Sequence, residues 1–207
     1  MKKILCYGDS NTFGYNPKDG SRFDQNTRWT SLLQTNLGIE YDVINEGICD
    51  RTGFVENSKG FIFSAPKHFP DFISKSDNID ILILWIGTND LQFQYDISLS
   101  VIENGLENLI KIAKTKVKKI IIIPPVILNE KVLDGYFKFQ FDKTSIIKSR
   151  KVEKIYRKLA DAYLCEIFNI NKITNPSDLD GLHYNENSHK IIANKLTVFI
   201  KNSNKQI

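Results

Sequence analysis

The feature that most constrains the fold is the alternation of short apolar runs with longer amphipathic stretches. The apolar runs typical of strands are Ile4–Tyr7, Tyr41–Asn45, Ile79–Trp85, Ile120–Ile123 and Ala162–Phe168. Three of them lack a regular polar–apolar alternation, as expected for parallel strands buried on both faces. Apolar residues recur at helical spacing in Trp29–Leu37, Ser98–Lys116, Lys143–Asp161 and Ser188–Ile200. This order predicts an α/β fold, a three-layer α/β/α sandwich around a five-stranded parallel sheet.

Length and composition fit one ordinary globular domain. The chain has 207 residues, which predicts a single domain over positions 1–207. Hydrophobic residues make up 42% and charged residues 25%, which excludes a disordered or collagen-like chain. The net charge is +4, and the lysines between Lys111 and Lys119 contribute to it. No aromatic residue interleaves them, so we interpret this run as a solvated helix face and expect no nucleic-acid partner.

Sequence features that would indicate a compartment other than the cytoplasm are absent. The N-terminus has only about five apolar residues before a charge, where a secretory signal needs roughly 7–15. No apolar run approaches the roughly 20 residues that span a bilayer. Cys6, Cys49 and Cys165 are odd in number and lack metal-knuckle spacing. We therefore expect a soluble cytoplasmic protein with no membrane span, disulfide framework or zinc site.

Two segments are irregular and rich in Gly, Asn, Ser and aromatic residues, namely Asn11–Thr27 and Gly47–Phe72. They follow the first two predicted strands. In an open parallel sheet, loops at the carboxyl ends of strands form the ligand crevice. Function is therefore expected in these loops.

The first candidate site is Gly8-Asp9-Ser10, directly after the first predicted strand. A serine on a strand-to-helix turn has an exposed hydroxyl and can serve as a nucleophile. The same residue types are common in helix caps and Asx-turns. The triplet alone leaves both interpretations open.

The second candidate is Asp180-Gly181-Leu182-His183, just before the last predicted helix. In a tight loop, Asp180 can bond one imidazole nitrogen of His183 while the other nitrogen points outward. Such a carboxylate fixes the tautomer of a general base and stabilises the imidazolium. Alternatively, Asp180 only caps a turn and His183 is merely polar.

Two small-residue turns could supply hydrogen-bond donors to a reacting oxygen. Asn45-Glu46-Gly47 follows the second predicted strand and Gly87-Thr88-Asn89-Asp90 follows the third. Backbone N–H groups and an Asn side chain there could converge on a tetrahedral intermediate, each worth about 2.7–4 kcal/mol of barrier. Four such blocks at strand ends are hard to explain by chance.

Taken together, the blocks Gly8–Gly14, Asn45–Gly47, Gly87–Asp90 and Asp180–His183 resemble those of the SGNH (GDSL-type) hydrolase family. They occur in the family's order over nearly the whole chain. Arg51-Thr52-Gly53 resembles the arylesterase and acyltransferase branch.

The resemblance implies a flavodoxin-like fold and a serine esterase acting on small acyl esters: acetyl-like esters of aryl, alkyl or carbohydrate alcohols. Ser10 would be the nucleophile, His183 the general base and acid, and Asp180 its orienting carboxylate. The Ser10 and Gly47 N–H groups and the Asn89 side chain would form the oxyanion hole. No cofactor and no metal would be needed.

One segment departs from that branch, because Ile48, Cys49 and Asp50 occupy positions that are usually small. Asp50 would place a negative charge near the oxyanion hole unless Arg51 neutralises it. Cys49 as an alternative nucleophile is disfavoured, since nothing nearby suggests a lowered thiol pKa.

Several residues in or beside the strand-end loops could line a substrate pocket. The candidates are Phe13, Tyr15, Phe54, Tyr95, Phe137 and Leu182, with Asp9 next to the nucleophile. We expect half of the apolar ones to be ordinary core.

The other two histidines are assigned no catalytic role. His68 lies among aromatics and prolines, which favours a partly buried structural residue over a lid or pocket rim. His189 is expected to face solvent.

Alternatives remain beside the small-ester esterase. The chain could be a lysophospholipase or acyl-thioesterase of the same family, or a catalytically silent binding protein on this fold. The expected partner is a small-molecule acyl ester. The aromatic-rich segment Pro124–Asp142 could act as a lid or as a contact within a homo-oligomer.

Overall fold

The computed structural model describes residues 1–203 and contains a five-stranded parallel sheet in the order β2-β1-β3-β4-β5. The strands are β1 (Lys2–Gly8), β2 (Tyr41–Gly47), β3 (Ile81–Trp85), β4 (Lys119–Ile123) and β5 (Glu166–Ile167). The predicted parallel sheet is therefore confirmed.

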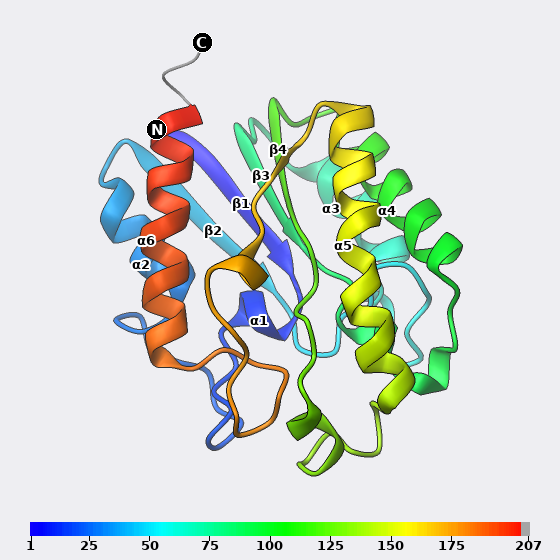
Figure 1. Ribbon diagram of the computed structural model, residues 1–207. Coiled ribbons are helices and arrows are strands. Elements are labelled where there is room, and N and C mark those ends of the chain that lie inside the picture. The colour runs from blue at the N-terminus through cyan, green and yellow to red at the C-terminus, as the bar shows by residue number, and fades with distance from the viewer. Residues whose placement is uncertain (204–207) are drawn as a thin grey trace.

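Helices cover both faces of the sheet, as the alternating pattern predicted (Figure 1). They are α1 (Ser10–Phe13), α2 (Trp29–Leu37), α3 (Ala65–Lys75), α4 (Leu99–Ala113), α5 (Lys143–Tyr163) and α6 (Glu186–Ser203). Helix α2 packs against α6 on one face, whereas α4 packs against both α3 and α5 on the other. The molecule is thus a three-layer α/β/α sandwich.

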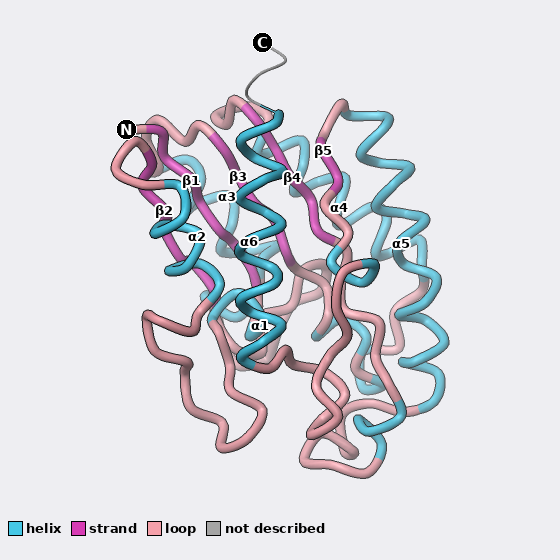
Figure 2. The backbone as a smooth tube through the Cα atoms, turned by 60° about the vertical axis from the view of Figure 1, so that its left-hand side comes forward, coloured by secondary structure: helices cyan, strands magenta, loops and turns pink. Residues whose placement is uncertain are grey.

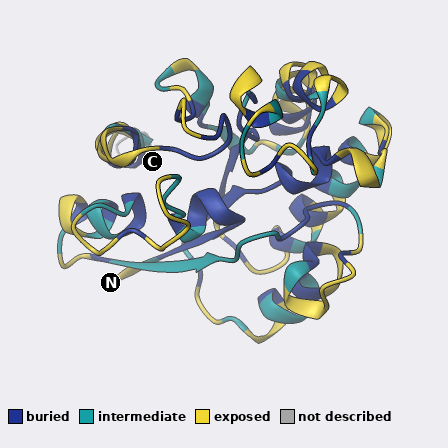
Figure 3. Cartoon of the chain, turned by 90° about the horizontal axis from the view of Figure 1, so that it is seen from below, coloured by how far each residue is buried: buried dark blue, intermediate teal, exposed yellow. Residues whose placement is uncertain are grey.

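The core runs along the central strands. All residues of β3 and most of β1 and β4 are buried, which explains their continuous apolar sequences. Edge strand β2 is mostly half-buried and contains both polar and apolar residues, and its intermediate burial is visible in Figure 3.

Strand register brings the functional loops to one level. Gly8 at the end of β1 is paired with Gly47 of β2 and with Trp85 of β3. The chain segments after all three strands therefore start side by side. Figure 2 shows the loops gathered at this carboxyl end of the sheet, at the bottom of the view.

Two predicted segments differ most from the structure. Residues 65–72 of the segment expected to be irregular form most of α3, because Pro66 lies in the first turn, where its missing N–H has no intrahelical partner, although Pro70 lies inside the helix. The predicted strand Ala162–Phe168 is reduced to Glu166–Ile167, because α5 continues through Tyr163 and ends at Leu164 in the left-handed region. A short apolar run does not by itself distinguish a helix end from a strand.

The lysines of the positive run are largely paired. Lys111, Lys118 and Lys119 form ion pairs with Glu107, Asp80 and Glu166. Among residues 1–203, no helix is long and apolar enough to cross a membrane.

Candidate active site

Ser10 stands at the end of β1 because the turn after that strand is unusually tight. A Cβ on Gly8 would lie 2.1 Å from Thr12 Oγ1 and 2.2 Å from the Trp85 carbonyl oxygen, so only glycine fits there. Asp9 caps α1, its Oδ1 accepting the Asn11 N–H at 3.0 Å. Asp9 is therefore a helix cap, and the same turn presents Ser10 at the cavity.

The loop before α6 positions an acid and a base by purely local contacts. Asp180 Oδ1 accepts the N–H groups of Leu182 and His183, each at 3.0 Å. Its Oδ2 lies 2.7 Å from His183 Nδ1. Gly181 has φ +71° and packs so closely on Asn129 that a Cβ would meet the Asn129 Oδ1 at 2.4 Å. Asp180 thus caps the turn with one oxygen and holds the imidazole with the other.

The serine and the histidine meet across 173 residues of sequence, with 2.8 Å between His183 Nε2 and Ser10 Oγ. The Tyr15 ring lies 4.2 Å and the Phe137 ring 5.3 Å from the imidazole, measured between centroids. With Asp180 accepting from Nδ1, the Nε2 lone pair faces the Ser10 hydroxyl. This hydrogen-bonded chain can remove the serine proton.

The Ser10–His183 pair opens into a cavity of about 200 Å³. Its lining residues are Ser10, Tyr15, Cys49, Asp50, Lys59, Asn89, Tyr136, Phe137, Gln140, Leu182 and His183. Three of the predicted pocket residues are therefore in place, namely Tyr15, Phe137 and Leu182.

The other predicted pocket residues lie elsewhere. Asp9 is fully buried, and Phe13 lies beneath the Arg22 guanidinium at 4.5 Å. Phe54 is buried and fills the space beside Gly87 and Gly105. Tyr95 is half-buried outside the cavity lining. Of the predicted residues outside the cavity lining, Phe54 belongs to the core, whereas Phe13 and Tyr95 are half-buried.

The predicted oxyanion donors have different surroundings. The Asn89 amide lines the cavity, donates one Nδ2 hydrogen to the Arg51 carbonyl at 3.0 Å, and accepts from Gln92 Nε2 through its Oδ1 at 3.1 Å. A second Nδ2 hydrogen remains available.

Gly47, in contrast, lies outside the cavity lining, and its N–H already donates to Asn45 Oδ1 at 2.9 Å. Glycine is required there because a Cβ would lie 2.1 Å from the Phe13 nitrogen. Asp50 lines the cavity instead, at φ +63°, and none of the described residues accepts its backbone N–H. The assignment of Gly47 as a donor is therefore corrected: its glycine serves close packing.

The charged residues near Asp50 form other ion pairs than the expected one between Asp50 and Arg51. Arg51 forms its ion pair with Glu46 at 3.1 Å, and Asp50 is neutralised by Lys59 at 2.6 Å. Burial, reinforced by Asp50 and Asp9, raises the pKa of Cys49 to about 12. A thiol so perturbed is a poor nucleophile near neutral pH.

Sequence reasoning missed the role of Asp90. Its buried carboxylate accepts the N–H groups of Gly53, Phe54 and Val55 at 2.6, 2.7 and 3.2 Å. Burial raises the pKa of Asp90 to about 6, opposed by these three donors. The donors lie 35–37 residues away in sequence, so no local signal could have revealed the contact.

The remaining histidines are structural. His68 is largely buried, its Nδ1 lies 3.1 Å from the Tyr7 hydroxyl, and desolvation lowers its pKa. His189 was expected to face solvent and is instead 1% exposed. Its Nδ1 accepts the Trp29 N–H at 3.2 Å, and burial lowers its pKa to about 3. It faces inward because α6 packs on α2 along this side.

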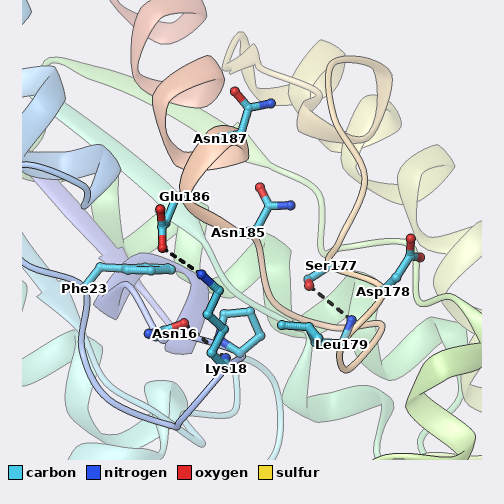
Figure 4. Close-up of a pocket in the computed structure, with 10 residues that line it drawn as sticks. Asn16, Lys18, Phe23, Ser177, Asp178, Leu179, Asn185, Glu186 and Asn187 are labelled. Atoms are coloured by element: carbon cyan, nitrogen blue, oxygen red, sulfur yellow. Dashed lines mark hydrogen bonds and ion pairs between the residues drawn. The ribbon is translucent and has the colours of Figure 1, made fainter.

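A second cavity, of about 470 Å³, is lined by residues on both sides of the 180–184 segment in sequence (Figure 4). Asn16, Lys18, Phe23 and residues 177–179 and 185–187 line it, and Lys18 and Glu186 form an ion pair at 3.1 Å. No serine–histidine pair faces it. Among residues 1–203, no group of three or more His, Cys, Asp or Glu side chains could hold a metal ion.

Comparisons with known proteins agree with this geometry. The model of the GDSL-like lipase/acylhydrolase family matches residues 6–191. The chain therefore belongs to this family, and it is a carboxylic ester hydrolase of the SGNH type. A comparison with curated proteins gave no significant match.

Solved structures share the fold over nearly their whole length. An aryl esterase of M. smegmatis is 24% identical, with 98% of this chain and 99% of that chain covered and a TM-score of 0.90. A carbohydrate acetylesterase family member from Sinorhizobium meliloti is 25% identical, with 97% and 98% covered and a TM-score of 0.89. A lipase/acylhydrolase from Enterococcus faecalis is 18% identical, with 98% and 97% covered and a TM-score of 0.68.

Proposed function

We propose that this hydrolase cleaves small, short-chain acyl esters through an acyl-Ser10 intermediate. The observation that carries the proposal is the unbroken chain from Asp180 Oδ2 to His183 Nδ1 and from His183 Nε2 to Ser10 Oγ, at 2.7 and 2.8 Å. It ends in a cavity where an ester can reach the hydroxyl.

In the first half-reaction, Ser10 Oγ attacks the ester carbonyl carbon while His183 Nε2 takes the serine proton. Asp180 stays ionised and stabilises the imidazolium. When the tetrahedral intermediate collapses, the bond to the alcohol oxygen breaks and His183 gives that oxygen its proton. Water then attacks the acyl-Ser10 with His183 again acting as base, which releases the carboxylic acid and restores the serine.

The negative oxygen of each tetrahedral intermediate needs preorganised donors. We assign these to the Ser10 N–H, the second hydrogen of Asn89 Nδ2 and the Asp50 N–H. Asp50 replaces Gly47 in this set because the Gly47 N–H is engaged by Asn45, whereas Asp50 lies in the wall of the cavity.

Cavity size favours a short acyl group. Pockets for drug-sized ligands measure about 300–1,000 Å³, and this one measures about 200 Å³. The Asp50–Lys59 ion pair at 2.6 Å lies in its wall and limits its extent. Similar structures described as an aryl esterase and a carbohydrate acetylesterase support acetyl esters as first substrates.

The test combines active-site labelling with an ester panel. A fluorophosphonate should label the wild type and leave Ser10→Ala unlabelled, and only the wild type should turn over p-nitrophenyl acetate. Equal labelling and turnover by Ser10→Ala would refute the proposal. In a panel of acetyl, octanoyl and palmitoyl esters, acetyl should be fastest; a preference for chains beyond eight carbons would favour a lysophospholipase or thioesterase instead.

A further inference from the structure

The proposed mechanism leaves one buried cation without a role. The Arg51 side chain has no solvent exposure, although an arginine is expensive to bury. Its guanidinium lies 4.2 Å above the Tyr7 ring and pairs with Glu46 on one side. A guanidinium that is buried and bonded in this way either stabilises the fold alone or also positions groups that take part in the reaction.

The guanidinium joins the ends of two strands that precede functional loops. Its Nη1 donates to the Glu46 carbonyl at 2.6 Å and to the Gly8 carbonyl at 3.2 Å. Gly8 lies two residues before Ser10, and Glu46 lies at the end of β2, where the 48–60 loop begins. Because each peptide unit is planar, the contact on the Gly8 carbonyl also fixes the Asp9 N–H, directly before Ser10, and the contact on the Glu46 carbonyl fixes the Gly47 N–H, at the start of the loop that carries Asp50.

The main chain of Arg51 reaches a third functional segment. Its carbonyl accepts one Asn89 Nδ2 hydrogen at 3.0 Å, which orients the amide of a residue that lines the cavity. Its N–H donates to the Ile48 carbonyl at 3.3 Å and closes the turn that contains Asp50. Side-chain Nε also donates to the Ile62 carbonyl at 3.0 Å, anchoring the far end of this loop.

We propose that Arg51 is a positioning residue that holds Ser10, the Asp50 turn and Asn89 in one arrangement, so that their donors converge on the reacting oxygen. This inference rests on the proposed function. Arg51 itself touches no substrate atom and acts only through Ser10, the Asp50 turn and Asn89. Lysine cannot replace it, because one ammonium lacks the planar fork that reaches several carbonyls at once.

The experiment measures kinetics per functional site, so that loss of folded protein does not count as loss of catalysis. Arg51→Lys and Arg51→Met are compared with the wild type using p-nitrophenyl acetate, with active sites titrated to completion by fluorophosphonate. The inhibition constant of a trifluoromethyl ketone, whose adduct mimics the tetrahedral intermediate, is measured alongside KM. Ile73→Val, at a buried position of α3, serves as a destabilised control outside this network.

We expect kcat per titrated site to fall about 10- to 100-fold in Arg51→Lys and further in Arg51→Met, with KM within threefold. Affinity for the trifluoromethyl ketone should fall in proportion to kcat, and the Ile73→Val control should keep both values. If both Arg51 variants keep wild-type kcat per site and only melt at lower temperature, Arg51 is purely structural and the proposal fails. If the wild type itself neither labels nor turns over, the proposed function fails instead.

Discussion

Two parts of the wall of the catalytic cavity are held in place in different ways. In one part, Asp180 fixes His183 through contacts only three residues apart in sequence. In the other part, Asn89 is oriented by Arg51 across 38 residues, and Asp90 fixes the loop at Phe54 across 36. The acid–base wall is a local turn, whereas the oxyanion wall depends on the packed sheet. We therefore expect substitutions far from the cavity to leave the acid–base wall unchanged and to disturb the oxyanion wall.

The largest effect is expected on the acid–base wall. His183→Ala should lower kcat by at least about 10⁴-fold, because His183 Nε2 is the group that is hydrogen-bonded to the Ser10 hydroxyl and takes its proton. The double variant with Ser10→Ala should be no worse than either single one, since the residues act as a unit. Steady-state hydrolysis of p-nitrophenyl acetate gives the comparison, and a His183→Ala enzyme retaining a tenth of wild-type kcat would contradict the assignment.

A smaller loss is expected from the oxyanion wall. Asn89→Ala should lower kcat about 10²- to 10³-fold with little change in KM, because its donor acts mainly in the transition state. Measuring kcat and KM separately tests this. A rise in KM at constant kcat would mean that Asn89 binds substrate and does not stabilise the intermediate.

A still smaller effect, on selectivity for acyl-chain length, is expected at the Asp50–Lys59 pair. Lys59→Ala removes a side chain from the cavity wall and should raise the octanoyl-to-acetyl ratio of kcat/KM about tenfold, the scale of a few methylene contacts. Lys18→Ala, in an exposed ion pair bordering the second cavity, is the matched control. An unchanged ratio in Lys59→Ala would show that acyl length is limited elsewhere.

The smallest catalytic effect is expected at His189. His189→Asn keeps an acceptor for the Trp29 N–H and should leave kcat within about twofold, because His189 lies outside the cavity lining. A kcat loss approaching that of His183→Ala would overturn the choice of base.

The same variant has a pH signature. In the folded chain the pKa of His189 is lowered from 6.5 to about 3, so below pH 6.5 the unfolded chain binds a proton that the folded chain does not. His189 therefore makes the wild type lose stability as pH falls from 6.5 toward 3, by at most about 1.4 kcal/mol per pH unit. Urea unfolding should show the wild type losing more stability than His189→Asn over this range. Parallel losses would exclude His189 as the source.

The contrast between local and long-range contacts also explains which parts of the fold and of the site can be predicted from the sequence. The sheet and most helices follow from periodicity, and the acid–base wall from a three-residue spacing. Asn89 was predicted to lie near the site because its block follows a strand, and it lines the cavity. The donor at Gly47 was misassigned because Asn45 reaches its N–H only in the folded turn. Roles of Arg51 and Asp90 are set by partners far away in the chain, and His189 is buried by packing of α6 on α2. Such long-range contacts leave no periodic signal in one sequence.

The most direct test of the account is to find which residue carries the acyl group. Wild-type protein is mixed with p-nitrophenyl acetate, quenched in acid within the first turnovers, digested, and examined by peptide mass spectrometry. We predict one acetyl group on Ser10, unchanged in Cys49→Ala and absent in Ser10→Ala. Acetyl on Cys49, or the same labelling in Ser10→Ala, would contradict Ser10 as the nucleophile.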